Sequence, residues 1–343
     1  MANGGLKRPA LNKPARISYL LIAGTLILAG CLHLATPLIA ALFAYFALTK
    51  LHFSERWSKW PAVVILLVIV AALAYGLGHF VHATVNALPE IADKAVPSVI
   101  DLARRWHIEL PFDDYDSLRA LIVEGVKNQA NYLGSALKFA RGATSEVLFI
   151  VVGLIVAIAI FLNPHLERGR AAQPIRQNLY SLCCDAIEER FTIFYRSFAT
   201  VMGAQIVISA INTILTAGFV LAVHMPYALV VIGGTFLCGL LPVVGNLISN
   251  TVVVGIGFTI SPTLALAALV FLIVVHKLEY FLNSKIVGDR IRTPLWLTLL
   301  GLIIGERLMG VPGMILAPVV LNYIRLEASQ IEVTATSDNT DHG

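Results

Sequence analysis

The stretch at residues 226–260 contains no charged side chain, and this feature limits the fold more than any other. An apolar run of that length is typical of a segment inside a bilayer. There every peptide N–H and C=O needs a partner within the protein, which favours helices. The chain is 57% hydrophobic and only 13% charged, whereas soluble domains carry about 25% charged residues. We therefore expect an all-α, polytopic membrane protein with about seven or eight hydrophobic segments.

This uncharged stretch carries signals of a broken helix near its middle. Pro242 lacks a backbone N–H and clashes with the preceding turn, while Gly245 permits backbone conformations that other residues avoid. Asn246 and Asn250 follow, four residues apart and therefore on one helical face. A break of this kind favours a substrate-binding or gating element that lines a cavity. The alternative interpretation is a proline kink with hydrogen bonds between helices.

Charge and hydropathy divide the chain into seven regions. Basic clusters at residues 7–16, 50–59 and 168–176 mark the cytoplasmic side, so we expect cytoplasmic termini. The apolar run at residues 17–48, interrupted at Thr36-Pro37, fits either a helix with a shorter hairpin partner or one long tilted helix. The predicted regions are a cytoplasmic tail (1–16), an N-terminal transmembrane block (17–85), a small helical extramembrane subdomain (86–143), a transmembrane span (144–163), a cytoplasmic amphipathic helix (164–196), a C-terminal transmembrane block with two broken helices (197–325) and a disordered tail (326–343).

A second apolar run, at residues 295–323, is also interrupted. Gly301 and Gly305 form a GxxxG pair that allows close helix packing. Glu306 and Arg307 then mark either the tip of a re-entrant hairpin or an ordinary loop between two short spans. The helix-breaking residues that follow are Gly310, Pro312, Gly313 and Pro318. Interrupted helices of this kind indicate a transporter site.

A carboxylate lies inside the span that precedes this run. Glu279 is about one turn from the end of that span, where charges are costly and usually functional. One interpretation makes it a protonatable or cation-binding group, and the other makes it a partner for an arginine such as Arg290 or Arg307. Neutral hydrogen-bonding groups available in the apolar segments are Gln205, Asn212, Asn246, Asn250 and Asn283. The predicted substrate- or ion-binding residues are Glu279, Asn246, Asn250, Asn283, Glu306 and Arg307.

Enzyme signatures are missing from the sequence. It contains no GxxxxGK[ST], no HExxH and no GxSxG. Its four cysteines form no CxxC pair, and its net charge of +4 comes with basic loops that orient a membrane protein. We therefore expect no enzyme activity, no cofactor, no metal site and no nucleic-acid partner. Transport would be driven by an ion gradient or by the solute's own gradient.

The C-terminal half contains PVVG at residues 242–245, Glu279 followed by NSKIVG at 283–288, and the later glycines with Pro318. This pattern resembles that of the autoinducer-2 exporter family of bacterial membrane proteins. The resemblance implies an inner-membrane location, export of a small polar signal in some members and sodium/proton antiport in others. Asn283-Ser284 departs from the family, in which a proline often follows the asparagine. The functional positions that the resemblance implies are Pro242, Gly245, Glu279, Gly288, Gly310, Gly313 and Pro318.

These observations predict a secondary transporter or facilitator that exports a small polar solute, such as an autoinducer-2-like signal or a metabolite. One alternative is a sodium/proton antiporter, in which H+ or Na+ is the partner of Glu279. The other is a membrane scaffold whose extramembrane subdomain (86–143) binds a protein partner. The remaining expected partners are membrane lipid and, because small residues line helix faces, a second copy of the chain.

Overall fold

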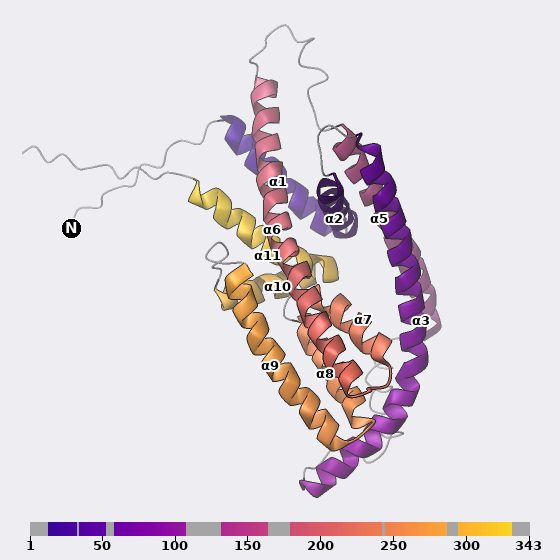
Figure 1. The fold of residues 1–343 in the computed structure, drawn as a ribbon. Helices are drawn as coiled ribbons and strands as arrows, with labels where there is room; N and C mark the ends of the chain where they lie inside the picture. The colour runs from indigo at the N-terminus through magenta and orange to yellow at the C-terminus, as the bar shows by residue number, and fades with distance from the viewer. Residues whose placement is uncertain are drawn as a thin grey trace, which may run out of the picture. The chain divides into compact units, whose positions relative to one another are not determined.

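The structure, a computed structural model, describes residues 13–32, 34–52, 58–107, 132–163, 179–241, 244–286 and 294–330. Every regular element in these ranges is a helix (Figure 1), which confirms the predicted all-α membrane fold. Within the same ranges, six helices are long and apolar enough to cross a membrane. They are α1 (Lys13–Cys31), α3 (Trp60–Arg105), α5 (Tyr132–Leu162), α6 (Leu179–Ala222), α9 (Pro262–Ile286) and α11 (Val311–Ser329).

Four shorter helices complete the described part of the chain: α2 (Ala35–Leu51), α7 (Ala228–Gly239), α8 (Val244–Phe258) and α10 (Leu295–Met309). The break between α1 and α2 agrees with the two-helix interpretation of residues 17–48. It lies before Pro37, which instead occupies the first turn of α2. A proline is tolerated there because the first amides of a helix have no partner within the helix.

Five helices, α1, α3, α5, α6 and α11, run through predicted region boundaries, and α3 and α6 are the longest of them. α3 has 46 residues and is therefore about 70 Å long at 1.5 Å per residue, whereas a span needs about 20 residues. It continues past residue 85 without a break, although the sequence becomes polar there. α6 likewise joins the predicted amphipathic stretch and the following span in one helix of 44 residues, with no proline inside it. Hydropathy changes along both helices while the backbone remains helical, and the division into regions stays a prediction.

The chain divides into two compact units, and α2, α5 and α6 each contribute to both. The first unit comprises α1, α10 and α11 together with residues 35–45 of α2, 153–162 of α5 and 179–201 of α6. Aromatic side chains pack within it, and the rings of Phe43 and Phe198 meet edge to face with centroids 5.0 Å apart.

In the first unit, α10 and α11 form a tight helical hairpin in which only Gly310 separates the two helices. Gly310 has φ +64° and ψ −147°, a conformation essentially confined to glycine. A Cβ atom at Gly305 would meet the carbonyl of Gly313, and one at Gly313 would meet the carbonyl of Gly305. Pro312 lies in the first turn of α11, and Pro318 lies inside α11 without ending it. The chain therefore reverses at Gly310.

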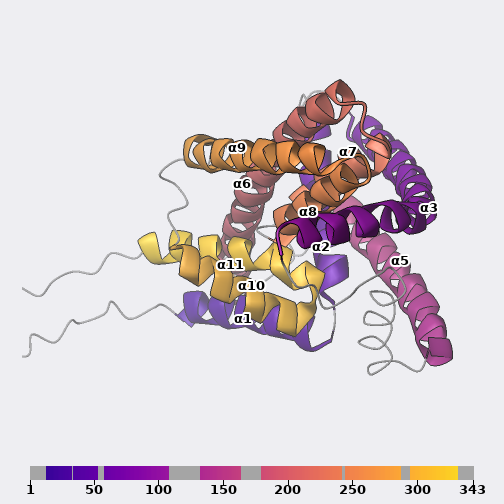
Figure 2. The same cartoon turned by 90° about the horizontal axis from the view of Figure 1, so that it is seen from below.

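The second unit comprises α3, α7, α8 and α9 with residues 46–51, 132–152 and 202–222 of the shared helices. α7 and α8 pack against each other, α8 packs against α9, and α3 contacts all three (Figure 2). Phe219 and Phe271 stack with centroids 4.4 Å apart, and the ring of Phe80 lies against Gly233 and Gly234. The buried core residues are Val220, Met225, Val231, Val253, Ile256, Ala268 and Leu272.

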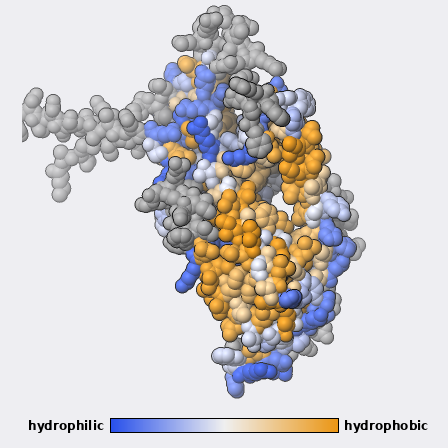
Figure 3. Space-filling view, in the orientation of Figure 1, coloured by the Kyte–Doolittle hydropathy of each residue, from blue (hydrophilic) through white to orange (hydrophobic). Residues whose placement is uncertain are grey.

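The outer side of α9 is apolar. Figure 3 shows hydrophobic side chains over this helix in the lower half of the view. Their exposure suits contact with lipid, since a helix in a bilayer needs no polar outer face. The exposed large hydrophobic side chains described on α9 are Leu266, Leu269, Val270, Ile273, Val274 and Leu278.

Candidate functional site

The uncharged stretch folds into two helices. α7 ends at Gly239 and α8 begins at Val244, and α8 folds back against α7 (Figure 1). The stretch is therefore a helical hairpin, whereas the alternative interpretation was a proline kink in one helix. A Cβ atom at Gly245 would meet the carbonyl of Cys238, so the turn has room only for glycine at this position. Pro242 lies outside the described residues.

The end of α7 leaves four carbonyl groups, those of residues 236–239, without partners in the helix. Amides of the turn satisfy the middle two. Leu240 donates its N–H to the carbonyl of Leu237 at 3.3 Å, and Leu241 donates its N–H to the carbonyl of Cys238 at 2.8 Å. The outer two carbonyls need donors from elsewhere.

Two polar side chains of α6 supply those donors. Ser209 Oγ donates to the carbonyl of Phe236 at 2.8 Å, and Gln205 Nε2 donates to the carbonyl of Gly239 at 2.6 Å. Each of the last four carbonyls of α7 therefore accepts a hydrogen bond from the protein itself. Gln205 was expected only as an available polar group, and Ser209 was not singled out. Their four-residue spacing on a predicted span was the signal that could have identified both.

We expect Gln205→Leu to lower the free energy of unfolding by about 1 kcal/mol, because the Gly239 carbonyl loses its donor in a buried place. The measurement is unfolding of the purified protein in mixed micelles. Thr213→Val is the matched control, since the Thr213 hydroxyl donates to the Ser209 carbonyl of its own helix. Equal losses in both variants would contradict the assigned capping role.

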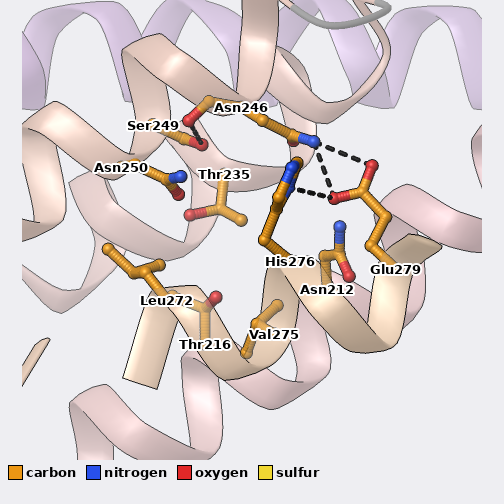
Figure 4. A pocket seen from close by; sticks show the side chains of 10 residues that line it. All are labelled: Asn212, Thr216, Thr235, Asn246, Ser249, Asn250, Leu272, Val275, His276 and Glu279. Atoms are coloured by element: carbon orange, nitrogen blue, oxygen red, sulfur yellow. Dashed lines mark hydrogen bonds and ion pairs between the residues drawn. The ribbon is translucent and has the colours of Figure 1, made fainter. Parts of the chain in front are cut away.

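A small polar pocket of about 20 Å³ lies beside this break, between α6, α7, α8 and α9 (Figure 4). A volume of about 10–15 Å³ already holds one water molecule, so the pocket has the size of a water or a small ion. Its lining residues are Asn212, Thr216, Thr235, Asn246, Ser249, Asn250, Leu272, Val275, His276 and Glu279. The structure thus brings together three predicted site residues, Asn246, Asn250 and Glu279.

The Glu279 carboxylate joins α8 to α9 at this pocket. Asn246 Nδ2 donates to Oε1 at 2.8 Å and to Oε2 at 2.7 Å. His276 Nδ1 lies 3.5 Å from Oε2. The Glu279 side chain is only 11% exposed, while the His276 side chain is 68% exposed. The carboxylate is therefore held mainly by an amide from the helix that follows the break.

The arginine interpretation of Glu279 stays a prediction. Arg307 belongs to the first unit, and its Nε lies 3.9 Å from Oε2 of Glu306. Both of these side chains are exposed, at 85% and 53% respectively, one turn before the Gly310 reversal. Arg290 lies outside the described residues. Within the described residues, the polar groups recorded at Glu279 are those of Asn246 and His276.

Two other predicted positions are placed only in part. Asn283 lies in α9, but its side chain is outside the described residues, and so is the whole of Gly288.

Asn212, expected only as an available polar group, lies in the pocket and is 6% exposed. Its position in the middle of an otherwise apolar predicted span was the signal that could have promoted it.

Comparison with known proteins points to a family of membrane transporters. A family profile described as AI-2E family transporter matches residues 17–325. The chain is 24% identical over 290 residues to YueF of Bacillus subtilis, which covers 77% of this chain and 76% of YueF. It is 31% identical over 125 residues to YdbI of the same organism, a match that spans 36% of each protein. Both relatives bear the name "Putative transport protein".

Proposed function

The chain belongs to the AI-2E family of transporters, and we propose that it is a secondary transporter or facilitator that exports a small polar solute across the bacterial inner membrane. One observation carries the proposal. A buried carboxylate and several neutral polar side chains line a pocket beside a broken helix in a membrane protein. Such polar groups are costly in a bilayer unless they serve a pathway or pair with one another.

The lining suggests the class of solute. Amide and hydroxyl groups from Asn246, Asn250 and Thr216 can exchange hydrogen bonds with a hydroxylated solute of the autoinducer-2 type. The volume of about 20 Å³ is far below the 300–1,000 Å³ or so of a typical ligand pocket. Such a solute therefore enters only when the contact between Asn246 and Glu279 opens. We infer that this contact is the gate.

Helix lengths support a re-entrant hairpin in the first broken run, and in the second run α10 is also short, while α11 is long enough to span. α7 has 12 residues, and α8 and α10 have 15 each, which correspond to about 18 and 22 Å at 1.5 Å per residue. The hydrocarbon core is about 30 Å thick. In the proposal each short helix enters the bilayer and returns with its partner, and the termini are cytoplasmic because basic residues precede α1.

We expect Glu279→Gln to slow efflux of autoinducer-2 from loaded proteoliposomes about tenfold, because the open pocket loses the carboxylate that would accept charge-assisted hydrogen bonds from the solute. Glu90→Gln is the matched control, since that exposed carboxylate is not among the pocket residues. It should retain the rate within about twofold, as surface substitutions usually do. An unchanged rate and pH dependence in Glu279→Gln would remove the proposed role of this carboxylate.

Sodium/proton antiport is the second candidate, and the small volume of the pocket favours it. An ion of that size fits without opening the contact between Asn246 and Glu279. A pH-sensitive dye inside proteoliposomes separates the two functions. Proton movement on adding sodium, without efflux of any loaded solute, would favour antiport over export.

A further inference from the structure

The end of α10 carries an exposed charged pair. The Glu306 side chain is 53% exposed and the Arg307 side chain is 85% exposed, one turn before the reversal at Gly310. Arg307 Nε lies 3.9 Å from Glu306 Oε2, which is too far for a hydrogen bond. Most of each charged side chain is therefore left to solvent.

Contacts within the first unit align α10 and α11 with α1. A Cβ atom at Gly30, near the end of α1, would lie 3.1 Å from Cε of Met309, at the end of α10. At the opposite end, the Tyr19 hydroxyl of α1 donates to Oε2 of Glu327, near the end of α11. The three helices run side by side (Figure 2), and the Gly310 reversal is level with the end of α1.

The uncharged parts of these helices are shorter than the bilayer core. They are residues 17–31 of α1, 295–305 of α10 and 311–324 of α11, which measure about 22, 17 and 21 Å at 1.5 Å per residue. The hydrocarbon core is about 30 Å thick, and α11 approaches that length only when its charged last turns are included. With α1 and α10 starting at the cytoplasmic boundary, the hairpin tip (residues 306–311) stops about 8 Å short of the opposite boundary.

Apolar side chains lie on both sides of the charged pair. Ile303, Leu308 and Val311 are 62%, 58% and 51% exposed. A turn that stands in water is rich in Gly, Asn, Asp and Ser, whereas exposed aliphatic side chains are typical of a surface in contact with lipid. Charges surrounded by lipid are costly unless they face water or a partner. The exposure of this pair makes water its partner, so water has to reach the hairpin tip.

We propose that a water-filled inlet enters the bilayer from the extracytoplasmic side and ends at Glu306 and Arg307. An arginine can extend toward a distant boundary, whereas the shorter glutamate beside it needs water at its own depth. One charge of each sign favours neither cations nor anions, so the inlet admits water and small uncharged polar solutes. Its use as the exit of the exported solute rests on the proposed function, whereas the wetting of the hairpin tip does not.

Thiol labelling of the full chain in spheroplasts tests whether water reaches the hairpin tip. The four native cysteines are replaced by serine, and a membrane-impermeant cationic methanethiosulfonate is added outside. We expect Arg307→Cys to react at least about tenfold faster than Ile303→Cys, because only the thiolate reacts and an apolar medium suppresses it. Ile303→Cys is the matched control, since Ile303 is exposed and lies one turn earlier on the same helical face. Glu306→Cys should react as fast as Arg307→Cys and replaces it if that variant does not fold.

A depth measurement separates an inlet from a hairpin tip at the ordinary membrane boundary. Bimane attached to Ile303→Cys in proteoliposomes is exposed to phospholipids brominated either at mid-chain or near the headgroup. Ile303 lies about 12 Å from the start of α10, close to the middle of a core of about 30 Å. We therefore expect the mid-chain bromines to quench the bimane more strongly than the headgroup bromines.

Three results would overturn the proposal. The first is labelling of Arg307→Cys no faster than that of Ile303→Cys, and the second is labelling only when the reagent is added to inverted vesicles. The third is stronger quenching at Ile303→Cys by the headgroup bromines, because the hairpin tip then lies at an ordinary interface. Failure of the export function is a separate result, in which the thiol at the tip reacts but no loaded solute leaves the vesicles.

Discussion

Replacing Arg190 with alanine should lower the free energy of unfolding by about 3–5 kcal/mol, the usual loss when one partner of a buried ion pair is removed. Arg190 Nη1 lies 2.7 Å from Glu327 Oε2, and the Tyr19 hydroxyl donates to the same oxygen at 2.9 Å. The Arg190 guanidinium also lies over the Tyr19 ring, 4.7 Å from its centroid. Glu327 is 5% exposed, so the variant leaves a buried charge without its cation.

An exposed ion pair in the same chain supplies the control. Lys94 Nζ lies 2.7 Å from Glu90 Oε1, and both side chains are more than half exposed. The hydrogen bond from Lys94 lowers the pKa of Glu90, yet solvent screens such pairs so strongly that they contribute little. Lys94→Ala should therefore leave the unfolding midpoint in mixed micelles unchanged. Similar losses in Arg190→Ala and Lys94→Ala would contradict the importance of the buried pair.

A double variant separates the charge from the packing. Arg190→Met with Glu327→Met replaces both charges by apolar groups and should recover most of the stability lost in Arg190→Ala. This recovery is expected because the large cost comes from the charge left alone and not from the absence of the pair. A double variant as unstable as the single one would assign the loss to packing between α1, α6 and α11.

Local reasoning predicted that Asn246, Asn250 and Glu279 lie together, but it did not predict the contacts between distant parts of the chain. Asn246 and Asn250 share a helical face, and Glu279 lies on the next helix in sequence, so spacing and chain proximity sufficed to bring them together. Arg190 and Glu327 are 137 residues apart. Each is charged and has other polar residues one or two positions away, which is typical of a solvated segment. Their pairing depends on how α6 and α11 pack.

Region boundaries show the same limit. Composition predicts a disordered tail from residue 326, whereas α11 continues to Ser329 and buries Glu327. A buried partner stabilises the last turn of that helix, and nothing within the tail indicates the partner. Charge predicted the tip or loop of the second broken run at Glu306 and Arg307, whereas both residues lie inside α10 and the chain reverses at Gly310. Local signals did not distinguish a proline that ends its helix from one that does not, and Pro318 remains inside α11.

Gly313→Ala is the second substitution with a large expected effect, and it acts through two backbones that touch. The new Cβ would meet the carbonyl of Gly305 and would also lie 2.8 Å from Cβ of Met309. Neither a carbonyl nor a Cβ atom can rotate away as the end of a flexible side chain can. The hairpin must therefore separate, and such overpacking costs about 1–3 kcal/mol or more.

Gly24→Ala is the control, and its expected change in stability has the opposite sign to that of Gly313→Ala. Gly24 lies inside α1, and a Cβ atom there would have nothing within 4 Å. Alanine is more stable than glycine in a helix by about 0.5–1 kcal/mol, so this variant should unfold later than the wild type while Gly313→Ala unfolds earlier. Gly305→Ala should match Gly313→Ala, because the two glycines meet at one contact. If Gly313→Ala were stabilised like Gly24→Ala, α10 and α11 would not be packed backbone to backbone, and the hairpin proposed to enter the bilayer would lose its physical basis.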